Sequence, residues 1–326
     1  MNPDLLKGWG VRPVDWQWGL NVAQELAPRV SLEVGYNRRW WGNYTVTDNT
    51  LIGPNDYQKW TIMAPSDPRL PGGGNYPVDV YTLTQAAANR GADNYVTFES
   101  DYGPSRTHFW HGVDITLNAR TRQGLNLQAG TTTGRSTIDT CASVLIIDSP
   151  DPRNCRLVDP YETTFRGSAS YTVPKVTVLI SATLRSQPTM QLTGTTAPTN
   201  TGGAPSGATP SGANLNVPNT LVRDLLGRLP PGGLATGTTT VALLDETHRL
   251  YADTRRNQID MRFAKVFRFD ARRVDIGIDL QNLLNTNYAT AYERQYSFTA
   301  ANGGTWNNPT TILGPRFMRF NFTLNY

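Results

Sequence analysis

Hydrophobic and polar residues alternate with a period of two along nine stretches of the chain. In the stretch 316–326, apolar side chains occupy every second position and polar side chains lie between them. Successive side chains of a strand point to opposite faces, so this pattern predicts a strand with one apolar and one polar face. A tilted strand of roughly 9–11 residues crosses a bilayer, so the stretch is long enough to span one. The apolar positions are Met318, Phe320, Phe322, Leu324 and Tyr326.

The other eight stretches have the same alternation and predict an all-β fold. In the first of them, Trp16, Trp18 and Leu20 alternate with Gln17 and Gly19. Lys265 interrupts one apolar row, and we expect it near an interface or at a bulge. The eight predicted strands are 14–26, 30–44, 107–121, 125–135, 163–173, 176–186, 257–269 and 274–285.

The connections alternate between tight turns and long polar loops. The turns are 27–29, 122–124, 174–175 and 270–273, and the loops are 45–106, 136–162, 187–256 and 286–313. This order puts every long loop at one end of the sheet, as in outer-membrane barrels with short periplasmic turns and long extracellular loops. We therefore expect an antiparallel transmembrane β-barrel segment of about nine strands, whose last strand ends at the periplasm.

Low sequence complexity marks one of these loops. Residues 193–216 are rich in Gly, Ala, Pro, Ser and Thr, so we expect this loop to bury no core and to be disordered. Further along, 221–229 has the spacing of a short amphipathic helix after Asn219, although we favour an irregular loop there.

Composition agrees with a strand protein and excludes a helical membrane protein. Hydrophobic residues make up 38% of the 326 residues, mean hydropathy is -0.42, and no apolar run approaches the length of a membrane helix. A transmembrane barrel stays possible because only alternate strand residues face lipid. The 8 Trp and 14 Tyr suit interfacial aromatic girdles, and they suit the core of a soluble β-protein equally well.

The positive net charge of +4 does not point to nucleic acid. The basic residues cluster in pairs near strand ends, such as Arg38–Arg39, Arg255–Arg256 and Arg272–Arg273. A nucleic-acid interface would need a continuous basic patch with a recognisable binding motif, and the sequence has neither. We therefore expect no nucleic-acid partner.

Two cysteines, Cys141 and Cys155, lie in one polar loop. In an oxidising compartment we expect a local disulfide, which stabilises by roughly 3 kcal/mol in the chain-entropy model. A pair of free thiols is the alternative. The loop contains no histidine, so a metal site is not favoured.

The sequence contains no constellation that indicates catalysis or metal binding. His108 and His111 are three residues apart in a predicted strand, so they face opposite sides and cannot share a metal. Asp148, Asp151 and Asp159 do not have the spacing of a calcium loop. Nucleophile elbows, phosphate loops and zinc motifs are absent, so we expect no enzyme activity, cofactor or metal. Charged residues on the polar strand faces predict a structural charge ladder: Asp260, Arg262, Arg268, Asp275 and Asp279.

A family resemblance lies near the C-terminus. The segment DLQNLLNTNY, followed by a loop with Trp306 and by Gly-Pro-Arg before the last strand, resembles the C-terminal tail of TonB-dependent outer-membrane receptors. A terminal aromatic residue, here Tyr326, is also typical of outer-membrane barrels. The long loops are similar to those of the Oar-like branch, whose members carry a carboxypeptidase-regulatory-like domain. The motif residues are Asn282, Leu283, Leu284, Asn285 and Tyr288.

The resemblance implies a 22-stranded barrel with a plugged lumen, of which residues 1–326 would form the last nine strands. The first 19 residues do not have the pattern of a signal peptide, so we expect a fragment without plug domain or signal peptide. The implied function is energised uptake of a scarce nutrient, such as a siderophore, glycan or peptide, across the outer membrane of a Gram-negative bacterium.

The implied partners are outer-membrane lipid, the TonB complex through the plug, the barrel-assembly machinery at Phe320, Phe322, Leu324 and Tyr326, and a surface lipoprotein. A passive porin or surface adhesion barrel is the alternative function, and a soluble β-sandwich is a third interpretation. Aromatic residues of the loops are the candidate substrate contacts: Trp60, Tyr76, Tyr81, Tyr95, Phe98, Tyr102 and Trp306.

Overall fold

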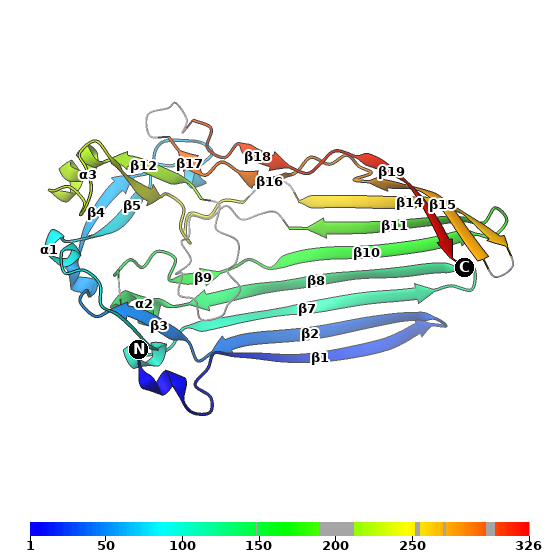
Figure 1. The fold of residues 1–326 in the computed structure, drawn as a ribbon, viewed down its shortest axis with the longest axis horizontal. Helices are drawn as coiled ribbons and strands as arrows, with labels where there is room; N and C mark the ends of the chain where they lie inside the picture. The colour runs from blue at the N-terminus through cyan, green and yellow to red at the C-terminus, as the bar shows by residue number, and fades with distance from the viewer. Residues whose placement is uncertain (148, 189–211, 252–254, 270–271, 298–303, 326) are drawn as a thin grey trace.

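All nine predicted strands form, and they pair side by side in one antiparallel sheet (Figure 1). A computed structural model describes residues 1–147, 149–188, 212–251, 255–269, 272–297 and 304–325. A short strand, β9 (Arg156–Val158), adds to the sheet beside β8. In sheet order the strands are β1 (Val14–Ala27), β2 (Val30–Gly42), β7 (Thr107–Arg120), β8 (Leu125–Asp139), β10 (Glu162–Val173), β11 (Val178–Gln187), β14 (Arg256–Phe269), β15 (Arg272–Gln281) and β19 (Phe317–Asn325).

The pairing register separates the sheet into an apolar face and a polar face. Directly paired residues share a face, so the side chains of each row across the strands are either mainly apolar or mainly polar. A row on the apolar face contains Ile180, Phe263, Ile278 and Phe320. The adjacent row on the polar face contains Ser181, Arg262, Asp279 and Arg319. Lys265 lies on the apolar face near a turn, where its Nζ donates to the Val176 carbonyl and no bulge occurs.

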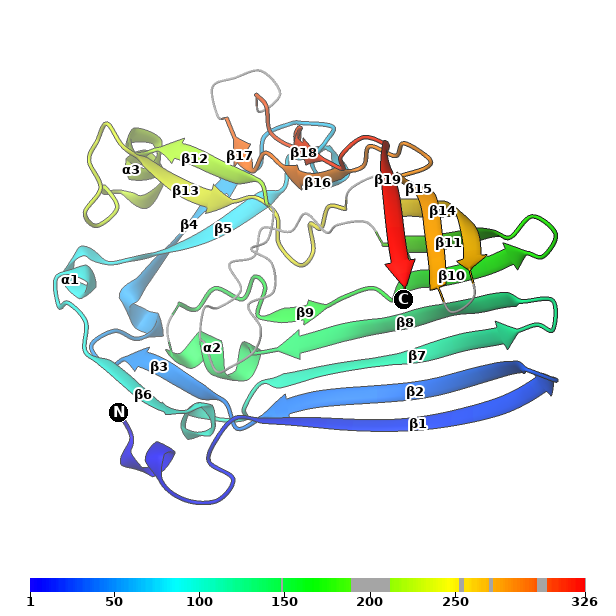
Figure 2. The same ribbon diagram turned by 45° about the vertical axis from the view of Figure 1, so that its right-hand side comes forward.

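The sheet is curved and open. Its first and last strands, β1 and β19, form the two edges and do not pair with each other within the described residues (Figure 2). No second sheet covers the apolar face in that part of the chain, and β1 is exposed along almost its whole length. The fold is therefore an all-β, antiparallel, single-layered sheet. Among the described residues, no helix is long and apolar enough to span a membrane.

The long loops gather at one end of the sheet, and the tight turns lie at the other (Figures 1 and 2). The loops contain three small sheets that pair β3 (Thr45–Asn49) with β6 (Asn94–Phe98), β4 (Tyr57–Met63) with β5 (Pro77–Leu83), and β16 (Ala289–Tyr292) with β18 (Pro309–Ile312). A fourth sheet has the order β13 (Thr238–Ala242), β12 (Asn214–Pro218) and β17 (Gln295–Tyr296). The helices are α1 (Gln85–Ala88), α2 (Cys141–Ile147), α3 (Asn219–Leu226), η1 (Pro3–Leu6), η2 (Pro54–Asp56), η3 (Pro71–Gly73) and η4 (Glu99–Tyr102).

The main hydrophobic core lies in these loops and not on the large sheet. We call the part built from residues 57–83, 212–250, 293–297 and 304–309 the loop unit. Its core combines segments that are far apart in the sequence, because no single loop has enough apolar residues to bury a core alone. The buried core residues are Trp60, Ile62, Ala64, Leu70, Tyr76, Val78, Ala213, Leu215, Val217, Val222, Leu226, Val241, Leu243, Leu244, Tyr296 and Trp306.

Two predictions for the loop 187–256 are corrected by this core. Residues 189–211 lie outside the described part of the chain, but Ala213 and Leu215, at the end of the low-complexity stretch, are fully buried. The irregular loop favoured after Asn219 is the helix α3. It forms because Val222 and Leu226, one turn apart, both pack into the core, which outweighs the weak helix propensity of so short a segment.

Neighbouring leucines at the end of α3 test this account. Leu226 is 3% exposed and Leu225 is 44% exposed. We expect Leu226→Ala to lower the free energy of unfolding of the loop unit by about 2–5 kcal/mol, because it removes buried methyl groups and leaves a cavity. Leu225→Ala is the matched control and should change it by less than about 0.5 kcal/mol. Equal effects in urea titrations followed by tryptophan fluorescence would contradict a packed loop core.

Candidate functional site

The polar face of the sheet forms a shallow groove of about 480 Å³. Residues of strands from β7 to β14 line it, and most have hydroxyl, amide or charged side chains. Asp114, for example, accepts hydrogen bonds from Asn37 at 2.6 Å and Thr132 at 2.5 Å. The groove is thus a polar surface whose side chains pair with one another in places. Its lining includes Asp114, Thr116, Gln128, Thr132, Thr164, Arg166, Thr183, Arg185, Gln258 and Asp260.

The charge ladder predicted for this face forms in part. Arg262 lies 3.8 Å from Asp279 on the next strand and donates to Asn321 at 2.7 Å. Asp275 pairs instead with Arg273 on its own strand at 2.8 Å. Arg268 does not join the ladder, because the register puts it opposite Arg273, another cation. These contacts hold adjacent strands together and do not form a catalytic arrangement.

Three of the seven candidate substrate contacts are core residues of the loop unit. Trp60, Tyr76 and Trp306 are all buried. Their polar atoms bond internally: the Trp60 indole donates to Thr82 at 2.9 Å, and the Tyr76 hydroxyl donates to the Leu243 carbonyl at 3.0 Å. These rings therefore stabilise the loop unit, and in this conformation they are not accessible to a ligand in solvent.

A buried carboxylate joins two distant segments around Trp306. Asp67, whose side chain is fully buried, pairs with Arg69 at 2.8 Å and accepts a hydrogen bond from the Tyr296 hydroxyl at 3.0 Å. Arg69 also donates to the Trp306 carbonyl at 2.6 Å, and its guanidinium lies 5.1 Å from the centre of the indole ring. Burial raises the pKa of Asp67, but the hydrogen bonds from Arg69 and Tyr296 outweigh burial and lower it overall. Burial, together with the bond to Asp67, raises the pKa of Tyr296 to about 12.

The other four candidates lie on partly exposed positions. Tyr81 is on β5, opposite Lys59 of β4. Tyr95 and Phe98 are on β6, and Tyr102 follows in η4, where its hydroxyl donates to Asp48 at 2.6 Å. The structure therefore divides the seven aromatics into a buried group and a partly exposed group, and only the second remains available for contact with a ligand.

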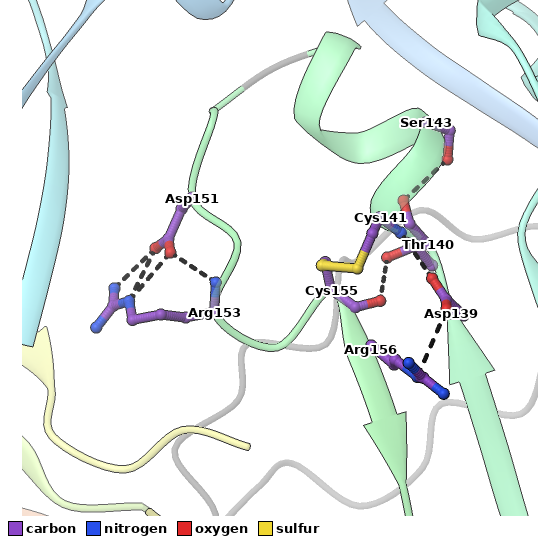
Figure 3. The surroundings of a disulfide bond; sticks show 8 residues. All are labelled: Asp139, Thr140, Cys141, Ser143, Asp151, Arg153, Cys155 and Arg156. Carbon is purple, nitrogen blue, oxygen red and sulfur yellow. Dashed lines mark hydrogen bonds and ion pairs between the residues drawn. A yellow bond between two sulfur atoms is a disulfide. The ribbon is translucent and has the colours of Figure 1, made fainter. Parts of the chain in front are cut away.

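Cys141 and Cys155 form the expected disulfide, with 4.8 Å between their Cα atoms (Figure 3). The bond joins the first residue of α2 to the residue before β9. Beside it, the Thr140 amide donates to the Cys155 carbonyl at 2.7 Å. The disulfide therefore closes a loop that already has a fixed base at the end of β8.

Sequence reasoning missed two buried polar clusters in the loops. Glu99 is fully buried, pairs with Arg106 at 2.8 Å and accepts a hydrogen bond from Ser143 of α2. In the loop unit, His248 stacks on Tyr76 with 3.7 Å between ring centres. A pattern of alternating residues carries no signal for either cluster, because their partners come from separate loops.

Asp245 completes the second of these clusters. It lies 2.9 Å from the His248 ring nitrogen and also accepts hydrogen bonds from Thr247. Burial raises the pKa of Asp245, but the hydrogen bonds from Thr247 and His248 more than compensate, so its pKa is lowered.

The motif near the C-terminus forms the turn that ends β15 and leads towards β16. Asn282 and Asn285 both have φ near +51°, a left-handed conformation that asparagine tolerates better than most residues. The Asn282 side-chain amide donates to the carbonyls of Thr286 and Gly314, each at 2.9 Å. Asn285 accepts from the Arg316 amide at 2.9 Å. This turn ends β15 at Gln281, shorter than predicted, and sets the start of β19.

The other motif residues have different surroundings. The Leu283 amide donates to the Ile259 carbonyl at 2.8 Å, and Leu284 is exposed. The ring of Tyr288 lies 5.9 Å from the Arg256 guanidinium.

The predicted terminal strand exposes its apolar side chains. Phe320 is 72% exposed, and Phe322 and Leu324 are also exposed on the same face. Tyr326 lies outside the described residues. No protein-family model matches the chain. No curated protein matches it either.

Asn282 tests the role of the motif as a turn. Asn282→Ala removes the donors to two backbone carbonyls and puts alanine, which tolerates a positive φ less well than asparagine, at φ near +51°, so we expect the free energy of unfolding to fall by about 1–3 kcal/mol. Asn282→Gly keeps the backbone conformation but also removes the donors, so the loss should be smaller. A stability equal to wild type for Asn282→Ala in chemical denaturation would refute this role.

The buried carboxylate gives a pH test. Because the folded pKa of Asp67 is below its ordinary value of 3.8, its stabilisation is present above pH 3.8 and is lost as the pH falls through the folded pKa. We expect Asp67→Asn to be less stable than wild type by about 1–3 kcal/mol at neutral pH, with the gap narrowing below about pH 4. Asp224→Asn, at an exposed site on α3, should be as stable as wild type at every pH. A gap for Asp67→Asn that does not depend on pH in thermal unfolding would contradict the mechanism.

Proposed function

We propose that the chain forms part of the barrel wall of a TonB-dependent outer-membrane receptor that takes up a scarce nutrient. The observation that carries the proposal is the uncovered apolar face of the large sheet. A water-soluble sandwich would cover such a face with a second sheet. The rows of exposed apolar side chains instead suit contact with lipid, and the polar face suits a hydrated lumen.

The strand order supports this orientation. With lipid on the apolar face, the tight turns lie at the periplasmic side and the loop unit lies outside the cell. The unpaired edges β1 and β19 need partners, because an open sheet edge is not stable in hydrocarbon. We propose that further strands complete a barrel of about 22 strands, with a plug that contacts TonB, as the resemblance implies.

The loop unit supports a receptor function. It is a folded surface that presents Tyr81, and the neighbouring loops, one of which contains the disulfide, present Tyr95, Phe98 and Tyr102 as the remaining candidate ligand contacts. A surface lipoprotein could dock there, and the barrel-assembly machinery would bind the terminal strand through Phe320 and Phe322. The chemical class of the nutrient stays open between siderophores, glycans and peptides.

Adjacent residues of β7 test whether the apolar face meets lipid. Ile115 is on the apolar face and Thr116 is on the polar face. In vesicles, we expect Ile115→Arg to lower the free energy of unfolding by about 2–4 kcal/mol, because a charge is expensive on the lipid side of a barrel. Thr116→Arg should be nearly neutral, because the lumen is hydrated. The measurement is urea-induced unfolding in phosphatidylcholine vesicles.

The outcome separates the two environments clearly. Ile115 is already partly exposed, so arginine at this position would be tolerated if water covered the apolar face. Equal tolerance of both variants, together with recovery of the folded chain without detergent, would refute the proposal. For a membrane barrel, we also expect unheated and heated samples of the wild type to migrate differently in a gel.

A further inference from the structure

A row of basic and aromatic residues crosses the apolar face near the loop end. The pairing register aligns Trp18 with Arg38, Arg38 with His111, and His111 with Arg135, across β1, β2, β7 and β8. We call these four residues the arginine row. Paired residues share a face, so both guanidinium groups are on the same side as the exposed apolar side chains.

Aromatic rings hold the two arginines in place. The Arg38 guanidinium lies 5.2 Å from the centre of the Phe109 ring, and that of Arg135 lies 4.7 Å from the centre of the Tyr161 ring. Between them, His111 accepts a hydrogen bond from Arg135 at 3.3 Å and lies 3.3 Å from the Tyr161 hydroxyl. The cations are thus ordered by ring contacts before any ligand binds.

In the part of the chain that the structure describes, neither arginine has an acidic partner. Within the described residues, no carboxylate oxygen lies within 4.0 Å of Arg38 or Arg135. The adjacent Arg39, on the polar face, pairs with Asp15, and Arg262 faces Asp279. Two nearby cations without counter-charges repel each other, so the arginine row favours an anion from outside the chain.

The row lies at the upper edge of the apolar band. On β2, the residues of this face between the turn and the row are Val30, Leu32, Val34 and Tyr36. The eight steps from Val30 to Arg38 cover roughly 26 Å along the strand at about 3.3 Å each. Barrel strands tilt by about 35–45°, so this length covers roughly 19–22 Å of bilayer height. Arg38 therefore lies near the end of an apolar band of about 25 Å, and its long side chain reaches the headgroups.

A groove beside the row has the matching shape and charge. Its volume is about 540 Å³, and its lining contains no acidic side chain. Indole, phenol and phenyl rings form most of the lining, together with the Arg38 guanidinium. Such a lining suits an amphiphile with an anionic head, because rings contact the neck of the molecule while the cation binds the charge. The groove is lined by Trp18, Tyr36, Arg38, Trp40, Trp41, Arg106, Thr107, His108 and Phe109.

We propose that the arginine row is a binding site for a phosphate-bearing lipid headgroup in the bilayer leaflet on the loop side. Phosphate oxygens accept hydrogen bonds from Arg38 and Arg135, and the acyl chains lie on Val34, Val113 and Ile115 below. The apolar rows below the cations are the reason to assign a lipid and not free phosphate. This inference rests on the proposed membrane function of the sheet.

The test compares lipid retention by the full chain in nanodiscs of phosphatidylcholine that contain a minor fraction of phosphatidic acid. After mild detergent release, native mass spectrometry counts each bound lipid. Wild type should retain phosphatidic acid in preference to phosphatidylcholine. Arg38→Gln/Arg135→Gln should lower that retention about tenfold or more, because it removes both charge-assisted contacts. Arg166→Gln/Arg185→Gln is the matched control, with the same charge change on exposed arginines of the polar face, and should retain the lipid like wild type.

Each result decides the matter. Equal retention of both lipids by wild type overturns the inference, whether or not the double variant folds. Equal retention by the Arg38/Arg135 variant and by wild type also overturns it, as does full displacement of the lipid by inorganic phosphate. In these cases the folded chain is still in the bilayer, and the proposed function stands. If wild type does not enter nanodiscs as a folded chain, the proposed function fails and the inference fails with it.

Discussion

The strict two-residue alternation along nine paired strands is the constraint on which the rest of this molecule depends. A register slip of one residue in any strand would turn its whole apolar row towards the polar face. Arg38 and Arg39 show how sharp this separation is. They are neighbours on β2, yet Arg39 pairs with Asp15 on the polar face, whereas Arg38 lies over Phe109 on the apolar face. Function on either face therefore depends on the register before it depends on any single side chain.

The loop unit follows a different principle. Its stability comes from apolar side chains that converge from separate loops, together with a few buried polar links such as Asp67 with Tyr296. The large sheet supplies almost none of this core, and Ala264 and Val266 are its main buried apolar residues. The two parts of the molecule are thus stabilised by different interactions: backbone pairing in the large sheet and side-chain burial in the loop unit.

This difference explains what the sequence could predict. All nine long strands were predicted within a few residues, because alternation is a local signal that each strand carries by itself. The loop unit was not predicted, because its contacts join residues such as Tyr76 and Leu243, which are 167 positions apart. The helix α3 was missed for the same reason, since the core and not the local sequence decides its conformation. The aromatic candidates Trp60 and Trp306 were assigned to a ligand because a sequence cannot tell a buried ring from an exposed one. The two cysteines were easier, because one short loop contains both.

The shared core of the loop unit also limits which of its positions can change independently of one another. A change at Trp306 or Leu215 must be matched by partners in other loops, so such positions are expected to change slowly. The exposed positions between them, such as Lys59 on β4 and Leu225 on α3, have no such restriction. Substitutions at these exposed positions therefore change the surface of the loop unit without a change in its fold.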